Sequence, residues 1–182
     1  MNEVTQQCLD TFPNWLASLP EDAVALASLL SADSIPEVAR RYVAGSLSYL
    51  YKSLDLIPDG IEDLGYLDDA FVLRVAAHLA VTESPESKEA DIRGLLARLS
   101  TEAELIRKAL EGDYARLESY VRTLRKSAAR GRSVDEIIGD SNVRGEFVHD
   151  VGAWAKSFKV PSFTRDEKTI IKLKSFLGSK LP

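Results

Sequence analysis

One short segment of this sequence concentrates acidic side chains that have no basic neighbour, and carboxylates are groups that bind cations and act as acids or bases. Between positions 55 and 69 there is no Lys or Arg, but there are six acids: Asp55, Asp59, Glu62, Asp63, Asp68 and Asp69. Carboxylates so close in the chain repel one another unless water, a cation or an arginine compensates their charge. The segment therefore predicts either a set of structural caps or a site for a positively charged ligand.

An architectural role would explain these acids without any ligand. Asp55 would accept backbone hydrogen bonds in a turn before Pro58, and Asp59 would begin a short helical turn. Asp68 or Asp69 would cap the helix that follows. The basic residues available as partners are Arg40, Arg41, Lys52 and Arg74.

Two functional interpretations stay open beside the architectural one. A hard cation such as Mg²⁺, Mn²⁺ or Ca²⁺ prefers carboxylate oxygens, although the spacing does not match an EF-hand loop. Its ligands would be Asp55, Asp59, Asp68 and Asp69. A water molecule bound to the ion would then carry a metal-dependent activity. Alternatively, the segment is an acidic surface that docks a basic protein partner.

Helices are the elements that must hold this segment. Apolar residues recur at spacings of three and four through most of the chain, and no stretch shows the sustained alternation of a strand. Pro20 opens a second helix, Ser84-Pro85-Glu86 opens another, and Thr101 begins a new helix or a bend. Residues 52–67 break the pattern. We predict an all-α protein, a compact bundle of about eight helices with no sheet.

Charge divides the chain into two parts. The first 120 residues hold 10 basic and 21 acidic residues, whereas residues 121–182 hold 13 basic and 7 acidic ones. We therefore predict an acidic helical domain over residues 1–112 and a mildly basic C-terminal helical region over residues 113–182. The C-terminal helices would bind a partner or fold back on the acidic part.

Length and composition are those of an ordinary globular chain. Its 182 residues are 45% hydrophobic, and the formal net charge of −5 disfavours nucleic acid as a partner. The one cysteine, Cys8, excludes an internal disulfide and argues against a zinc–cysteine site. The N-terminus shows no signal-peptide pattern, and the most apolar stretch, Ala70–Val81, is too short to span a membrane. We therefore expect a cytoplasmic protein.

Basic residues gather after position 121 and form a candidate anion-binding patch. Its members are Arg122, Arg125, Lys126, Arg130 and Arg132. Such a run on a helix is usually a solvated face, but it could also meet the acidic part of the chain or the headgroups of an anionic membrane. Peripheral membrane binding is therefore the weaker alternative function.

The acidic segment also resembles a known family. Leu-Asp-Leu-Ile-Pro-Asp (residues 54–59), followed by Leu-Gly-Tyr-Leu-Asp-Asp (residues 64–69), is similar to the signature of the YkvA-like family, domain of unknown function 1232. The resemblance covers roughly residues 40–80. The residues on the family pattern are Asp55, Pro58, Asp59, Gly65, Tyr66, Asp68 and Asp69. The resemblance implies no established reaction.

No catalytic constellation is recognisable in the sequence. It contains no phosphate-binding loop, no nucleophile elbow and no histidine pair at metal-ligand spacing. We therefore expect a non-enzymatic interaction or scaffold protein that presents residues 55–69 to a protein partner and needs no cofactor. The alternative is a divalent-cation-dependent activity at the carboxylates.

Overall fold

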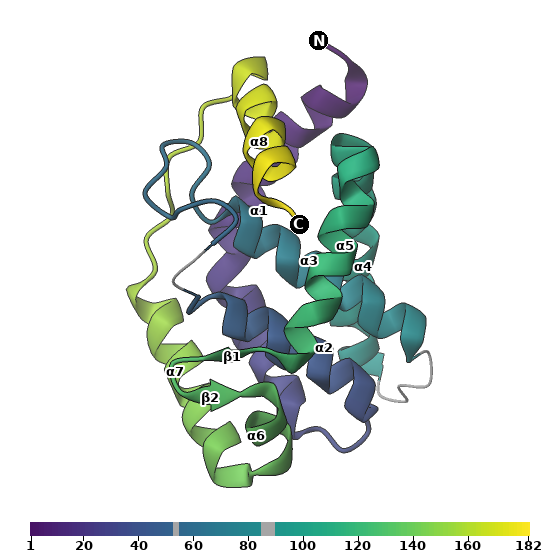
Figure 1. Cartoon of the computed structure of the whole chain (residues 1–182), viewed down its shortest axis with the longest axis vertical. Coiled ribbons are helices and arrows are strands. Elements are labelled where there is room, and N and C mark those ends of the chain that lie inside the picture. Colours follow the sequence, from purple (N-terminus) through teal and green to yellow (C-terminus); the bar gives the residue numbers. More distant parts are fainter. Residues whose placement is uncertain (53–54, 85–89) are drawn as a thin grey trace.

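The computed structural model describes residues 1–52, 55–84 and 90–182. Within them the chain forms eight α-helices, which confirms the all-α prediction (Figure 1). The helices are α1 (Glu3–Ser28), α2 (Glu37–Tyr49), α3 (Leu67–Glu83), α4 (Ala90–Leu110), α5 (Gly112–Thr123), α6 (Val134–Gly139), α7 (Ser141–Ser157) and α8 (Glu167–Lys180). Single 3-10 turns follow α1 at Leu29–Ser31 and α5 at Leu124–Lys126.

Helix α3 lies in the middle of the fold, and four other helices pack against it (Figure 1). It contacts α1, α2, α4 and α5, and its residues from Leu67 to Ala77 are all buried. A helix that is covered on every side needs apolar residues on every face, and the run from Ala70 to Ala80 supplies them. The first turn of this buried helix carries Asp68 and Asp69, so the fold itself takes two carboxylates into the interior.

Arg74 is the one basic residue within the buried part of α3. Its guanidinium pairs with Glu102 of α4 at 2.7 Å and with Asp22 of α1 at 3.4 Å, and it lies 4.2 Å from the ring centre of Trp15. A buried arginine requires such partners because an unpaired charge in the interior is costly. The side chain therefore joins three helices and is not directed at the acids of the same helix.

Helix α1 is continuous through Pro13 and Pro20, so the prediction that Pro20 opens a second helix is wrong. A proline inside a helix removes one backbone hydrogen bond and costs about 3 kcal/mol. Buried residues lie on both sides of each proline, among them Phe12, Trp15 and Ala23. Their packing against the same core outweighs the local cost.

A short hairpin between α5 and α6 contradicts the expectation of no sheet. Strands β1 (Ala128–Ala129) and β2 (Arg132–Ser133) pair antiparallel. The turn between them has positive φ angles, 50° at Arg130 and 76° at Gly131. This is the conformation that tight hairpin turns need, and glycine supplies it without strain.

The C-terminal helices share one core with the N-terminal ones. Helix α1 contacts α7 and α8, and α2 contacts α6. Buried residues from both sides of position 112, such as Leu16, Ile137 and Leu173, belong to the same apolar cluster. Helix α4 runs through Thr101 without a break, whereas the predicted start at Pro85-Glu86 lies outside the described residues. None of the described helices combines the length and apolarity needed to cross a membrane.

Candidate cation site at the start of helix α3

The acidic loop, residues 55–69, connects α2 to α3 and includes the first turn of α3. Its apolar residues hold it against the core, since Leu56, Ile57 and Leu64 are buried. At Gly65 the backbone passes so close to the loop's earlier part that an added Cβ would lie 2.2 Å from the carbonyl oxygen of Asp59. This close approach brings Asp59 next to the beginning of α3.

Three carboxylates meet where the loop folds back on α3. Asp59, Asp68 and Asp69 each offer one oxygen, and these oxygens all lie within 4.8 Å of one another. Asp59 is exposed, whereas Asp68 and Asp69 have relative exposures of only 1% and 3%. The cluster therefore has a buried floor and one side that faces solvent.

Asp68 is fixed in place by a small hydrogen-bond network. Tyr49, at the end of α2, donates its hydroxyl to Oδ2 of Asp68 at 2.5 Å, and the N–H of Ile57 donates to the same oxygen at 3.2 Å. The Tyr49 hydroxyl in turn accepts from the N–H of Leu56 at 2.8 Å. No pattern in the sequence indicates this role of Tyr49.

Other oxygens in the cluster have no partner among the described residues. Oδ1 of Asp68, Oδ2 of Asp69 and Oδ1 of Asp55 are buried and accept no hydrogen bond there. Buried polar atoms are almost always hydrogen-bonded, because an unsatisfied one costs roughly 1–3 kcal/mol. The unsatisfied oxygens of the neighbouring residues Asp68 and Asp69 are therefore the feature of this site that most needs an explanation.

The basic residues that the sequence offered as partners are engaged elsewhere. Arg41 pairs with Glu37 and Asp135, and Arg40 donates to the carbonyl of Ile35. The ammonium group of Lys52 contacts the Tyr120 hydroxyl at 3.4 Å, and its charge still acts to lower the pKa of nearby Asp55. Within the described residues, no ion pair involves any of the four candidate ligands, Asp55, Asp59, Asp68 and Asp69.

Desolvation raises the pKa of all four carboxyl groups, none of which forms an ion pair with the described residues. Desolvation is the main cause, and it raises the pKa of Asp55 to about 7 and that of Asp68 to about 6. The pKa of Asp69 lies well above its ordinary value because of burial and then because of the charge on Asp68. Partial desolvation also raises the pKa of Asp59, and the hydrogen bond from the neighbouring hydroxyl of Tyr66 opposes this shift. Without a cation, these carboxyl groups therefore lose their protons at higher pH than ordinary aspartates do.

The outer acids of the loop contact the C-terminal part of the chain. The N–H and the hydroxyl of Thr164 both donate to Oδ1 of Asp63, at 2.8 and 2.9 Å. Phe158 packs edge-on against Tyr66 with ring centres 5.0 Å apart, and Lys172 donates to the carbonyl of Glu62 at 3.3 Å. In Figure 1 the segment between α7 and α8 runs beside the loop. These contacts join residues about a hundred positions apart, and no local pattern in the sequence indicates them.

The other residues of the family pattern shape the loop. Pro58 is exposed beside Asp59, and Gly65 is buried. Tyr66 has a φ angle of 67° and immediately precedes α3. The structure thus brings Asp59, Asp68 and Asp69 together, with Asp55 near enough for their charges to interact.

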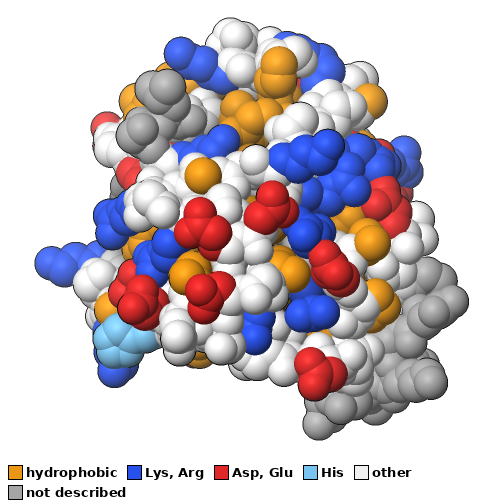
Figure 2. All heavy atoms as spheres, turned by 60° about the horizontal axis from the view of Figure 1, so that its bottom comes forward, with side chains coloured by type: hydrophobic (Ala, Val, Ile, Leu, Met, Phe, Trp, Pro, Cys, Tyr) orange, Lys and Arg blue, Asp and Glu red, His pale blue; other side chains and the backbone are white. Residues whose placement is uncertain are grey.

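The predicted basic patch does not form one free surface. Arg122 pairs with Glu83 and Glu118, and Arg125 lies 3.9 Å from Glu83. Arg132 pairs with Asp150 at 2.5 Å, whereas Lys126 and Arg130 form no ion pair with the described residues. On the face shown in Figure 2, acidic and basic side chains are interspersed. Much of the excess charge of the C-terminal part is therefore balanced within the chain.

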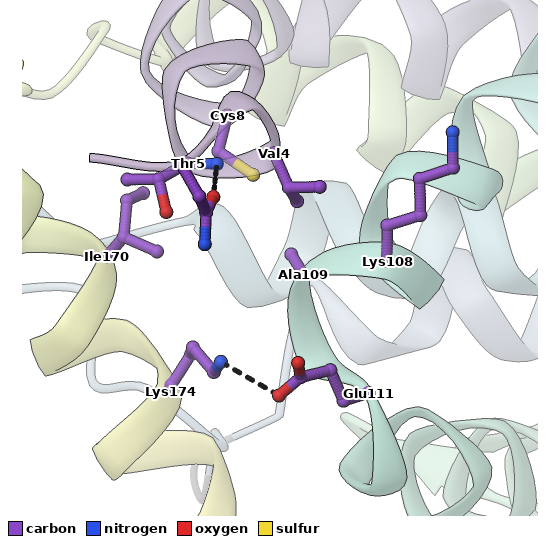
Figure 3. A pocket seen from close by; sticks show the side chains of 9 residues that line it. Val4, Thr5, Cys8, Lys108, Ala109, Glu111, Ile170 and Lys174 are labelled. Carbon is purple, nitrogen blue, oxygen red and sulfur yellow. Dashed lines mark hydrogen bonds and ion pairs between the residues drawn. The ribbon is translucent and has the colours of Figure 1, made fainter.

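A cavity of about 80 Å³ lies between α1, α4 and α8 (Figure 3). Cys8 lines it, and Lys174 pairs across it with Glu111 at 3.2 Å. Burial raises the pKa of the Cys8 thiol to about 11, so the thiol stays protonated and is a poor nucleophile. A volume of this size suits a few water molecules. We assign no function to this cavity.

The structure thus defines a helical protein with a buried carboxylate cluster at the start of its central helix. A family model described as protein of unknown function, DUF1232, matches residues 39–74. This segment contains most of α2, the acidic loop and the first turns of α3, and the match confirms the resemblance noted in the sequence. The comparisons with curated proteins and with solved structures give no match.

Proposed function

We propose that this protein binds a divalent metal ion through Asp59, Asp68 and Asp69. One observation carries the proposal: Oδ1 of Asp68 and Oδ2 of Asp69 are buried and without a partner among the described residues, beside the exposed Asp59. A cation at this point would satisfy both oxygens and would compensate the mutual repulsion of the acids.

The donor set selects the kind of ion. All three groups are carboxylates, and neither His nor Cys belongs to the cluster, so a hard ion such as Mg²⁺, Mn²⁺ or Ca²⁺ fits best. Tyr49 and the N–H of Ile57 would act as outer partners that orient Asp68. Asp55, whose Oδ1 is also without a partner among the described residues, lies outside this group of three, although its charge interacts with those of Asp59 and Asp68.

The arrangement supports ion binding more than presentation of the loop to a protein partner. Asp68 and Asp69 are buried, so they offer little surface to a second macromolecule. Asp63 is bound by Thr164 of the same chain. Of the six acids, Asp59 and Glu62 are exposed, and two exposed carboxylates are a small docking surface. The proposal concerns binding and assigns no reaction.

Thermal unfolding of chelator-treated protein tests the proposal, with Mg²⁺, Mn²⁺ or Ca²⁺ added to separate samples. An ion present at a hundred times its dissociation constant raises the free energy of unfolding by about 2.7 kcal/mol, which corresponds to a rise of roughly 5–10 °C in the thermal midpoint. Asp69→Asn should abolish this shift and still fold, because it removes a charge whose burial is costly. Paramagnetic resonance of Mn²⁺ would measure binding directly.

Glu62→Gln is the matched control. It removes one charge from the same loop, but its side chain is exposed and only its carbonyl oxygen accepts a hydrogen bond. The ion-dependent shift should survive in this variant. Two results together would overturn the proposal. The thermal midpoint of the wild type would be unchanged by 10 mM of each of the three ions, and the paramagnetic resonance signal of free Mn²⁺ would not decrease when the protein is added.

A further inference from the structure

A second hollow lies beside α7. Tyr51, just after the end of α2, and Arg130, in the turn of the β-hairpin, also line it. Its volume is about 330 Å³, which is within the range of small-molecule sites. The residues that line it are Tyr51, Arg130, Asp150, Ala153, Trp154 and Ser157. None of them belongs to the candidate cation site.

Arg130 supplies a positive charge at this hollow that no described carboxylate neutralises. Its guanidinium lies 4.8 Å from the ring centre of Tyr51, and the arginine itself occupies the left-handed position of the hairpin turn. Asp150, which also lines the hollow, is already paired with Arg132 at 2.5 Å. The hollow therefore has an excess of one positive charge, held by a planar group that binds carboxylates in a bidentate manner.

Aromatic rings supply the apolar part of the lining. Trp154 is half-buried, and its ring packs against Phe158 with centres 5.1 Å apart. Tyr51 packs edge-on against Phe147 at 6.3 Å. Each ring is held by an aromatic neighbour, so a planar ligand would meet surfaces that are already ordered and would order few side chains on binding.

We propose that this hollow binds a small aromatic carboxylate. The carboxylate would pair with Arg130, and the ring would pack against Trp154 and Tyr51. A single free cation matches a monoanion better than a phosphate dianion, and the aromatic lining selects a ring over acetate-like ions. The second oxygen of Asp150 is available to accept from a hydroxyl group on the ring.

Titration with benzoate and 4-hydroxybenzoate, followed in a ¹H–¹⁵N spectrum, tests this proposal. The chain has two tryptophans, so the indole N–H of Trp154 reports the hollow and that of buried Trp15 is an internal reference. We expect Trp154 alone to shift, with a dissociation constant of roughly 0.1–1 mM for so small a ligand. Benzamide, which has no charge, should bind at least about tenfold more weakly.

Two variants separate this site from general attraction to a basic surface. Arg130→Gln should weaken benzoate at least about tenfold, and Ala153→Phe should block the hollow. Arg122→Gln is the control, because Arg122 is already paired with Glu83 and Glu118, and it should leave binding unchanged. Equal binding of benzamide, tighter binding of inorganic phosphate, or equal loss in Arg122→Gln would each overturn the proposal. An unshifted Trp154 signal at 10 mM benzoate would do the same.

Discussion

The hydroxyl of Tyr49 lies 2.5 Å from Oδ2 of Asp68 and joins the end of α2 to the beginning of α3. The same hydroxyl accepts a hydrogen bond from the N–H of Leu56, so one side chain satisfies both a buried carboxylate and the backbone of the acidic loop. Burial of the phenol, followed by the charge of Asp68, raises the pKa of Tyr49, which therefore stays a hydrogen-bond donor at any ordinary pH.

Replacement of Tyr49 by Phe should destabilise the protein. The change leaves the Leu56 N–H and one acceptor position of Asp68 unsatisfied in the interior, and we expect a loss of about 1–3 kcal/mol in the free energy of unfolding, measured in urea. Tyr114→Phe is the control, because that hydroxyl makes no hydrogen bond with the described residues; it should cost less than about 0.5 kcal/mol. Equal losses in the two variants would show that the Tyr49 hydroxyl has no special role.

Stability without divalent ions should fall as pH rises from about 4 to about 7. The pKa values of Asp55 and Asp68 are raised to about 7 and about 6, and that of Asp69 is also raised. The folded state therefore binds more protons than the unfolded state in this window, and deprotonation costs it stability. Urea unfolding at several pH values, in the presence of a chelator, measures the slope.

Asp69→Asn identifies the source of that slope. The variant should lose less stability than the wild type between pH 4.5 and pH 8, with a difference of the order of 1–3 kcal/mol. A saturating divalent ion should reverse the trend in the wild type, because ion binding requires deprotonated carboxylates. Parallel pH profiles of wild type and Asp69→Asn without ions would contradict the assignment.

Gly65→Ala should disrupt the acidic loop, whereas Gly60→Ala should not. A Cβ at position 65 would lie 2.2 Å from the carbonyl oxygen of Asp59, but one at position 60 meets nothing within 4 Å. We expect the first change to cost about 2–3 kcal/mol and the second to change stability by less than about 1 kcal/mol. Thermal midpoints of the two variants make the comparison, and equal midpoints would mean that the close approach at Gly65 is not required.

Helical periodicity predicted the fold class because most helices bury one face and show it in the sequence. Predictions from local sequence patterns were wrong where contacts between distant residues determine the structure. Packing on both sides of Pro13 and Pro20 keeps α1 continuous, although each proline alone favours a break. The hairpin at Arg130 and Gly131 depends on two positive φ angles, for which the sequence showed only a single glycine.

In the sequence the candidate site is visible as a group of acids that lies on a family signature. Their number and spacing predict Asp55, Asp59, Asp68 and Asp69 as candidate ligands, but do not indicate which of these side chains are buried. That depends on α3 being covered on all sides, a property of the whole bundle. Tyr49 looked like one more aromatic residue on a helix, and Thr164 lies 101 positions from its partner Asp63, so neither had a local signal.

The contact between Thr164 and Asp63 bears on how this domain can be cut and transplanted. The segment that matches the family model ends at residue 74. Its acidic loop is nevertheless covered on one side by the segment between α7 and α8, through the contacts of Thr164 with Asp63 and of Phe158 with Tyr66. An excised fragment of residues 39–74 would expose the flank that Phe158 and Thr164 now cover. The matched segment therefore depends on contacts from a distant part of the chain. A chimera that transplants it should also include the segment between α7 and α8.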